Sequence, residues 1–248
     1  MIKSAVILFL SASLGGILAI NSIDIISKNI KHLLVFAGSF LFSVTIIHIL
    51  PEIFEAGEDH LHVGGFILLG FFFQQVLEYF TDGVEHGHMH HHHKGEEGHT
   101  TLKSISLMVA LSVHGFLEGT LLAHPGSVHA DHTEGTLLAG IIFHKIPAAL
   151  ALISVLACQY KSRKTQLILL TIFALASPIG VFTGHFLGDF GLLDSTGMVL
   201  LFAFVSGNFL HISTTIFLES SPGHRWSSRK LIISLFGAGL AVLSEMIF

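Results

Sequence analysis

Charged residues are scarce in this chain of 248 residues, because Asp, Glu, Lys and Arg together make up 12% of it and hydrophobic residues 51%. With a mean hydropathy of +0.74, this composition excludes a soluble globular domain. Cysteine is almost absent as well, and the single copy, Cys158, excludes a disulfide within the chain. No nucleic-acid partner is expected. What the chain does contain is apolar sequence for roughly eight membrane crossings.

Eight apolar runs follow one another along the sequence. A helix needs about 20 mainly apolar residues to cross the hydrocarbon core of a bilayer, and each run comes close to that length. The runs are Ser4–Ile20, Leu33–Ile53, Val63–Phe80, Leu102–Ala123, Gly135–Gln159, Thr165–Phe190, Met198–Leu218 and Leu231–Phe248. They predict an all-α membrane protein with eight transmembrane helices.

Lys and Arg are missing from every second loop between these runs. The loops without them carry acidic residues, whereas the others hold the basic residues Lys28, Lys31, Lys94, Lys103, Lys161, Arg163, Lys164, Arg225, Arg229 and Lys230. The positive-inside rule therefore predicts that the basic loops are cytoplasmic and that both termini are outside, with Lys3 as an exception. A cleaved signal peptide at the first run is the alternative, but it would place the basic loops outside. We interpret the first run as a transmembrane helix.

Histidine is abundant, with 19 copies, and many of them fall between the third and fourth runs. Residues 84–100 have too little apolar surface to fold alone, which predicts a flexible cytoplasmic loop. Imidazole suits Zn²⁺, Cu²⁺, Ni²⁺ and Fe²⁺, so the loop is expected to bind such ions with low selectivity. A purification tag and a merely solvated linker are the alternatives. The loop histidines are His86, His88, His90, His91, His92, His93 and His99.

A histidine and a glutamate lie four residues apart inside the fourth run. In a helix, His114 and Glu118 would share one face and point at the same neighbouring helix. Either the pair is joined by a hydrogen bond, or the carboxylate is neutralised by a proton, or the two form half of a metal site built by two helices.

The fifth run is interrupted by His144, Lys145 and Pro147. A lysine near the centre of a membrane costs several kcal/mol, so Lys145 should face an anion, and Glu118 is the obvious candidate. A lone histidine is more often a packing residue than a ligand, but five runs carry a polar or proline break. The remaining breaks are at His48, Pro51, Glu52, Ser177, Pro178, Asn208 and His211.

At these residues the chain resembles the ZIP family of divalent-metal transporters. The matching motifs are His114-Gly-Phe-Leu-Glu118-Gly119, His144-Lys145-Ile-Pro147, His48-Ile-Leu-Pro51-Glu52, Ser177-Pro178-Ile-Gly180 and Gly207-Asn-Phe-Leu210. The resemblance implies one eight-helix domain over residues 1–248, in which helices one to three and six to eight form inverted repeats around helices four and five. It also implies a metal site made of His114, Glu118 and His144, completed by water or by a group from the second helix.

The sequence departs from many family members in the second half of that site. Members with two adjacent metals carry Asn or a similar residue, an acidic residue and a Glu where this chain has Gly115, Lys145 and Ala148. A second cation beside Lys145 would be repelled and would lack ligands. We therefore expect a one-metal site in which the ammonium of Lys145 replaces the second ion, and the closest motif match is the subgroup with His-Lys in the fifth helix.

The predicted function is transport of divalent transition metals, with Zn²⁺ as the expected ion and Fe²⁺, Mn²⁺ or Cd²⁺ left open, into the cytoplasm by alternating access. The chain is not expected to be an enzyme or to hold a cofactor, because the metal is its substrate. His48 and Glu52 are expected near the entrance, Glu78, Asp82 and His211 near the exit, and Asn208 and Lys145 beside the metal ligands.

Two other functions stay open. One is an intramembrane zinc hydrolase that cleaves a lipid amide or ester with Glu118 as general base, and the other is a metal sensor that does not transport. The expected location is the plasma membrane or a bacterial inner membrane, and a homodimer is left open.

Overall fold

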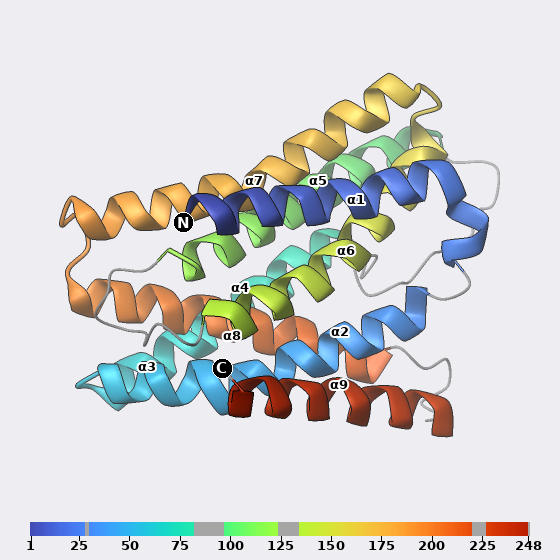
Figure 1. Ribbon diagram of the computed structural model, residues 1–248. Helices are drawn as coiled ribbons and strands as arrows, with labels where there is room; N and C mark the ends of the chain where they lie inside the picture. Colours follow the sequence, from blue (N-terminus) through green and yellow to red (C-terminus); the bar gives the residue numbers. More distant parts are fainter. Residues whose placement is uncertain (28–29, 82–96, 124–133, 220–226, 248) are drawn as a thin grey trace.

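The structure of the protein, a computed structural model, describes residues 1–27, 30–81, 97–123, 134–219 and 227–247, and these contain helices and no β-strand (Figure 1). Because each helix satisfies its own backbone hydrogen bonds, this is the expected solution for a chain so apolar. The elements are α1 (Ile2–Ser27), α2 (Ile30–Val44), the π-helix η1 (Thr45–Ile49), α3 (Leu50–Ala56), α4 (His60–Thr81), α5 (Glu97–Leu121), α6 (Glu134–Gln159), α7 (Arg163–Asp189), α8 (Ser195–Glu219) and α9 (Ser228–Ile247).

Each of the eight predicted runs overlaps a helix, with ends that differ by up to seven residues, and α2, η1 and α3 together form the second one. Six described segments are long and apolar enough to cross a membrane, and the apolar part of α5, Ile105–Leu121, is shorter. One boundary was wrong: α5 begins at Glu97, so residues 97–100 of the predicted loop are helical. Polar residues can continue a helix beyond the apolar run, since its backbone hydrogen bonds need no membrane. Residues 82–96, with Asp82 and six of the loop histidines, lie outside the described residues.

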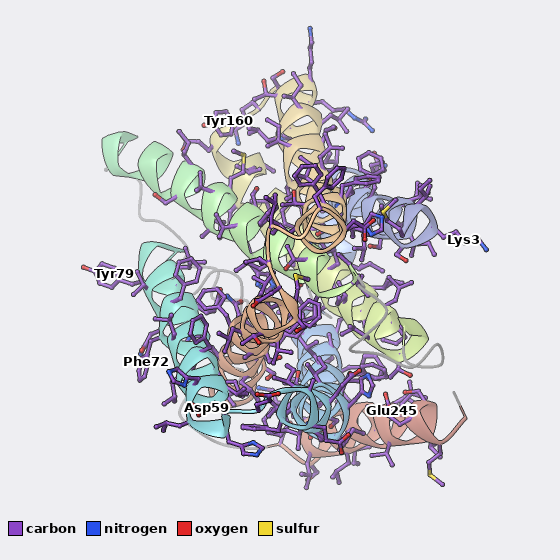
Figure 2. The ribbon with its side chains drawn as sticks, turned by 90° about the vertical axis from the view of Figure 1, so that its left-hand side faces the viewer. Lys3, Asp59, Phe72, Tyr79, Tyr160 and Glu245 are labelled. Carbon is purple, nitrogen blue, oxygen red and sulfur yellow. The ribbon has the colours of Figure 1, made fainter. Side chains whose placement is uncertain are left out.

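The helices pack in pairs that are distant in sequence. α4 lies against α8, α5 against α7, α1 against both α6 and α7, and α2 against α9. Figure 1 shows α1 and α7 along one side of the bundle, α2 and α9 along the other, and α6 between them. In the end-on view of Figure 2, α1 and α7 occupy the upper part and α2, α4, α8 and α9 the lower part.

Glycines allow the closest of these contacts. A Cβ at Gly70 of α4 would overlap the backbone of Phe204 on α8, and a Cβ at Gly180 of α7 would overlap the carbonyl of Phe116 on α5. Small residues are enriched where membrane helices approach closely, because packing between backbones replaces the hydrophobic driving force that lipid removes. These glycines therefore allow α4 to approach α8, and α7 to approach α5, at backbone distance.

Replacement of Gly70 by Ala is expected to destabilise the protein, because α4 and α8 must separate to admit the methyl group. Overpacking of this kind costs about 1–3 kcal/mol or more. The matched control is Gly65→Ala in the same helix, where a Cβ would meet nothing within 4 Å. Thermal unfolding in detergent should show a lower midpoint for Gly70→Ala and an unchanged or slightly raised one for Gly65→Ala, and equal midpoints would contradict this packing.

The start of α4 is capped by Asp59. One carboxylate oxygen accepts hydrogen bonds from the backbone N–H groups of Leu61 (2.9 Å) and His62 (3.2 Å), and the other lies 2.6 Å from Nδ1 of His62. Asp59 is thus a typical N-cap residue. The hydrogen bond from the His62 side chain holds the pKa of Asp59 below its usual value. The cap fixes the turn between α3 and α4.

Two apolar clusters fill the bundle, one on each side of a polar layer. Along α5, Leu107 and Leu111 belong to one cluster and Leu121 to the other. Along α6, Ile141 belongs to the cluster of Leu121, and Leu152 belongs to the cluster of Leu107. The polar residues predicted from the sequence lie between these groups on both helices, so apolar packing closes the layer from both ends.

Candidate metal centre

His114 and Glu118 from α5 and His144 from α6 meet in this layer. Among the described residues, they form the group of potential metal ligands whose donor atoms all lie within 4.8 Å of one another. Nε2 of His114 is 2.9 Å from Oε1 of Glu118, and Nε2 of His144 is 3.9 Å from the same oxygen. All three side chains are at most 4% exposed. The i, i+4 spacing places the α5 pair on one face, and α6 crosses beside it.

The orientation of His114 is fixed by Asn208 of α8. Nδ1 of His114 donates a hydrogen bond of 3.0 Å to Oδ1 of Asn208, which is fully buried. Since the amide oxygen can only accept, a neutral His114 that donates this hydrogen bond carries its proton on Nδ1 and its lone pair on Nε2. Metal-binding histidines in proteins are held in this way, with the second ring nitrogen donating to a carbonyl or carboxylate.

A proton or a metal ion must lie between His114 and Glu118. Nε2 of His114 lies 2.9 Å from Oε1 of Glu118, which is a hydrogen-bond distance. Two acceptors at this distance repel unless a proton or a metal ion lies between them. Tetrahedral Zn²⁺ with bonds of about 2.0–2.1 Å would separate its ligand atoms by about 3.4 Å, which falls between the two measured distances. The three side chains therefore have the composition and approximate spacing of three ligands of a zinc site.

Lys145 pairs with the other oxygen of the same carboxylate, as the sequence predicted. Its ammonium donates to Oε2 of Glu118 and lies 5.2 Å from the centre of the Phe173 ring, and its side chain is 1% exposed. Gly115 makes room for it, since a Cβ there would lie 2.6 Å from Nζ of Lys145. The hydroxyl of Ser177 donates to the carbonyl of Gly115 at 2.7 Å. The two carboxylate oxygens of Glu118 thus have different partners: Oε1 faces the two histidines and Oε2 faces Lys145.

The other predicted residues fall into two separate places. His211 of α8 forms a hydrogen bond with Glu78 of α4, so these two candidates for the exit are brought together. His48 of η1 lies 3.6 Å from Glu52 of α3, measured between Nε2 and Oε2. The ligand group does not include His48 or Glu52, so the expected contribution of the second helix to the metal shell is not seen among the described residues. Asn208 of α8 is the residue that adjoins the ligands instead.

Sequence reasoning missed Glu245, to which it gave no role. This residue of α9 lies beside α2, and its Oε2 is 3.5 Å from Nδ1 of His48 (Figure 2). An acidic residue inside an apolar run was the available signal, because such residues are rare unless they have a partner. The sequence did not indicate which helix would supply that partner.

The fold and the cluster define an integral, multi-pass membrane protein with a buried His–Glu–His group. A family model described as "ZIP Zinc transporter" matches residues 81–245, which is more than half of the chain. The chain belongs to the ZIP family. That family consists of transporters and not of enzymes.

Individual relatives agree with this membership. The protein is 28% identical over 178 residues to "Zinc transporter ZIP9" of Micropogonias undulatus, which covers 68% of this chain and 55% of the relative. It is 27% identical over 172 residues to "Zinc transporter ZIP9-A" of Xenopus laevis, covering 66% and 54%. Similarity to "Zinc transporter ZIP1" of Plasmodium falciparum (isolate 3D7) is 22% over 232 residues, covering 64% and 63%. The chain thus spans about half the length of the ZIP9 relatives it matches.

Replacement of Asn208 by Leu is expected to weaken zinc binding about 10- to 100-fold, because the Nδ1 proton of His114 loses its acceptor and the ring its fixed orientation. Isothermal titration of the purified protein, with the loop histidines replaced by Ser, would measure this. Ser206→Ala is the matched control, since Ser206 is a buried residue of the same helix that bonds to its own helix at the carbonyl of Phe202. An Asn208→Leu variant with unaltered zinc affinity would show that Asn208 does not orient a ligand.

Proposed function

We propose that the protein carries divalent transition-metal ions, Zn²⁺ foremost, across the membrane through a single-metal site formed by His114, Glu118 and His144. The observation that carries this proposal is the buried convergence of two imidazoles on one carboxylate oxygen within the membrane. Imidazole and carboxylate ligands suit Zn²⁺ and related ions. The names of the zinc-transporting relatives support the same function.

The charges of the site favour passage of an ion over permanent retention. Lys145 already neutralises Glu118, so a divalent ion would add two uncompensated positive charges to a buried layer. At about 4 Å and an effective dielectric constant of about 20, two unit charges interact by about 4 kcal/mol, and a divalent ion would feel about twice that from the ammonium. The same repulsion excludes a second ion at Lys145. A site of this kind binds one ion and can release it.

Paired glycine contacts support an inverted repeat that relates α1, α2 and α4 to α7, α8 and α9. Gly70 of α4 meets the backbone of Phe204 on α8, and Gly237 of α9 meets the carbonyl of Phe36 on α2. If α1, α2 and α4 are exchanged with α7, α8 and α9, the contact of α4 with α8 corresponds to the contact of α9 with α2. The helix pairs α4–α8 and α2–α9, which are among the most extensive of the bundle, are related in the same way.

A second glycine pair extends the relation to α5 and α6. Gly180 of α7 meets the carbonyl of Phe116 on α5, and Gly15 of α1 meets the carbonyl of Ile146 on α6, where the added Cβ would be 2.6 Å away. Phe116 and Ile146 each follow a ligand histidine by two residues. His114 and His144 are therefore equivalent positions in the two halves of the site.

This equivalence supports a single metal ion. The position in α6 that corresponds to Glu118 is Ala148, and the position that corresponds to Gly115 is Lys145. One half of the site thus supplies a histidine and a carboxylate, whereas the other half supplies a histidine and an ammonium. At these equivalent positions, α5 provides a carboxylate and α6 does not.

Alternating access fits a layer that is closed by apolar clusters toward both ends. Rocking of one half of the repeat against the other would open one cluster while the other stays closed. With the basic loops in the cytoplasm, ions would pass from the side of His48 and Glu52 toward the side of Glu78 and His211. The helices that carry these residues would together form a single transport domain.

Purified protein in liposomes tests the function. We expect ⁶⁵Zn²⁺ to enter the vesicles faster than into protein-free ones, with no release of fatty acid or amide product from the lipid. Lipid turnover without ion flux would support the zinc hydrolase, for which Glu118 would have to act as a base. Zinc binding without either would support the sensor.

A further inference from the structure

We propose that the start of α7 binds an anionic phospholipid, whose head group is held by Arg163 and Lys164 and whose acyl chain lies in the adjoining groove. Both basic side chains are exposed, and both line an open groove of about 540 Å³. The other residues of its lining are Leu167, Ile168, Thr171 and Ile172. A volume of this size is typical of sites for small organic ligands.

The lining of the groove beyond the basic residues is mainly apolar. Leu167, Ile168 and Ile172 follow Lys164 by one or two helical turns and are between 38% and 51% exposed. The hydroxyl of Thr171 bonds to the carbonyl of Leu167 at 2.8 Å, so it is satisfied within its own helix. Since α7 is long and apolar enough to span a membrane, these side chains face lipid chains. The groove therefore suits an acyl chain.

Positive charge is concentrated at this end of α7. Lys161, Arg163 and Lys164 are all exposed within four residues, and the first turn of α7 contains no acidic residue. The opposite end of the helix carries Asp189 instead. In the orientation predicted from the loops, the basic end lies at the cytoplasmic leaflet, whose anionic lipids attract basic segments. Charge complementarity therefore favours an anionic lipid over a neutral one.

Arg163 is held in position by α1. Its Nη2 donates a hydrogen bond of 2.7 Å to Oδ1 of Asn21, and Figure 1 shows the end of α1 and the start of α7 at the same end of the bundle. A guanidinium has five N–H donors, so this bond leaves donors for the oxygens of a phosphate. Because the planar group is already oriented, it loses less conformational entropy when it binds. The first-turn N–H groups of a helix add to the attraction of an anion.

The start of α9 provides a comparison for the start of α7. Arg229 is an exposed arginine in the first turn of α9, and the loop before it is cytoplasmic by the same rule. Arg229 does not line the groove of α7. A general attraction between basic residues and an anionic membrane would act on both helix starts alike, whereas the proposed site also needs the groove. Arg229→Gln is therefore the matched control.

Counting bound lipid by native mass spectrometry tests this site independently of transport. The full-length protein would be purified in a neutral detergent and titrated with dioleoylphosphatidylglycerol or, separately, with dioleoylphosphatidylcholine. We expect a single phosphatidylglycerol per chain to bind more tightly than any phosphatidylcholine. The double variant Arg163→Gln/Lys164→Gln should weaken this binding by at least about 10-fold, since each basic residue near a membrane surface contributes about 5-fold. Arg229→Gln should leave the binding unchanged.

Two further measurements separate the head group from the acyl chain. Thr171→Trp should fill the groove and weaken the binding of phosphatidylglycerol, whereas excess glycerol 3-phosphate, which has no acyl chains, should not displace the lipid. Size-exclusion profiles would confirm that each variant is folded.

Four results would overturn the lipid site. Equal losses in Arg163→Gln/Lys164→Gln and Arg229→Gln would show a general attraction to anionic lipid, and equal affinity for the two lipids would show that the head group is not recognised. Displacement by glycerol 3-phosphate would show a site for a free anion. Unaltered binding by folded Thr171→Trp would show that the groove holds no chain.

Discussion

Replacement of His114 or Glu118 by Ala is expected to abolish zinc uptake while the protein remains in the membrane. Each change removes one of the three buried side chains that we propose as metal ligands. The loss should exceed the roughly 10- to 100-fold reduction that removal of an outer partner of a metal ligand causes. Uptake of ⁶⁵Zn²⁺ into liposomes, normalised to the amount of inserted protein, measures the effect.

The two variants differ in their consequences for stability. Glu118→Ala leaves the ammonium of Lys145 buried without its carboxylate, which costs about 3–5 kcal/mol, whereas His114→Ala leaves that ion pair in place. Glu118→Gln keeps the shape and one acceptor for Lys145, so it separates loss of the ligand from loss of the fold. Thr120→Ala is the control, since Thr120 is a buried residue of α5 whose hydroxyl bonds to its own helix at Leu117. Wild-type uptake by folded His114→Ala or Glu118→Gln would refute the proposed ligand set.

Replacement of Lys145 by Met is expected to have two opposite effects, namely lower stability without metal and tighter zinc binding. Met has a similar length but no charge, so Glu118 becomes a buried carboxylate without its counter-ion. Breaking such a pair from one side costs about 3–5 kcal/mol. A metal ion would then have the whole carboxylate and no neighbouring ammonium, so its affinity should rise by at least about 10-fold.

Thermal unfolding with and without Zn²⁺ would measure both effects of Lys145→Met at once. The midpoint of the variant should lie below that of the wild type in chelator and should rise much more when Zn²⁺ is added. Lys164→Met is the matched control, because Lys164 is exposed at the start of α7. A Lys145→Met protein that binds Zn²⁺ more weakly than the wild type would show that the ammonium does not compete with the ion.

The sequence predicted the central group well because its signals are local. Helical spacing puts His114 and Glu118 on one face, and a lysine at the membrane centre must have an anion nearby. The resemblance to the ZIP family added His144 as the third ligand. These constraints identified the α5–α6 contact without any knowledge of the other helices.

The contacts of Asn208 and Glu245 could not be predicted in the same way. Asn208 was recognised as a polar interruption, but its bond to His114 depends on how α8 packs against α5. The partner of Glu245 depends on the α2–α9 contact and on a π-turn that no periodicity indicates. The α2–α9 contact includes a close approach at Gly237, which only the assembled bundle reveals.

The number of zinc ions that depend on Glu118 distinguishes a one-metal centre from a two-metal centre. Equilibrium dialysis would compare the protein lacking its loop histidines with its Glu118→Gln variant, so that ions bound elsewhere cancel in the difference. A single ion shared with Lys145 predicts a difference of about one ion per chain. A difference of two ions would contradict the single-metal site, because it would mean that a second metal binds beside the ammonium of Lys145.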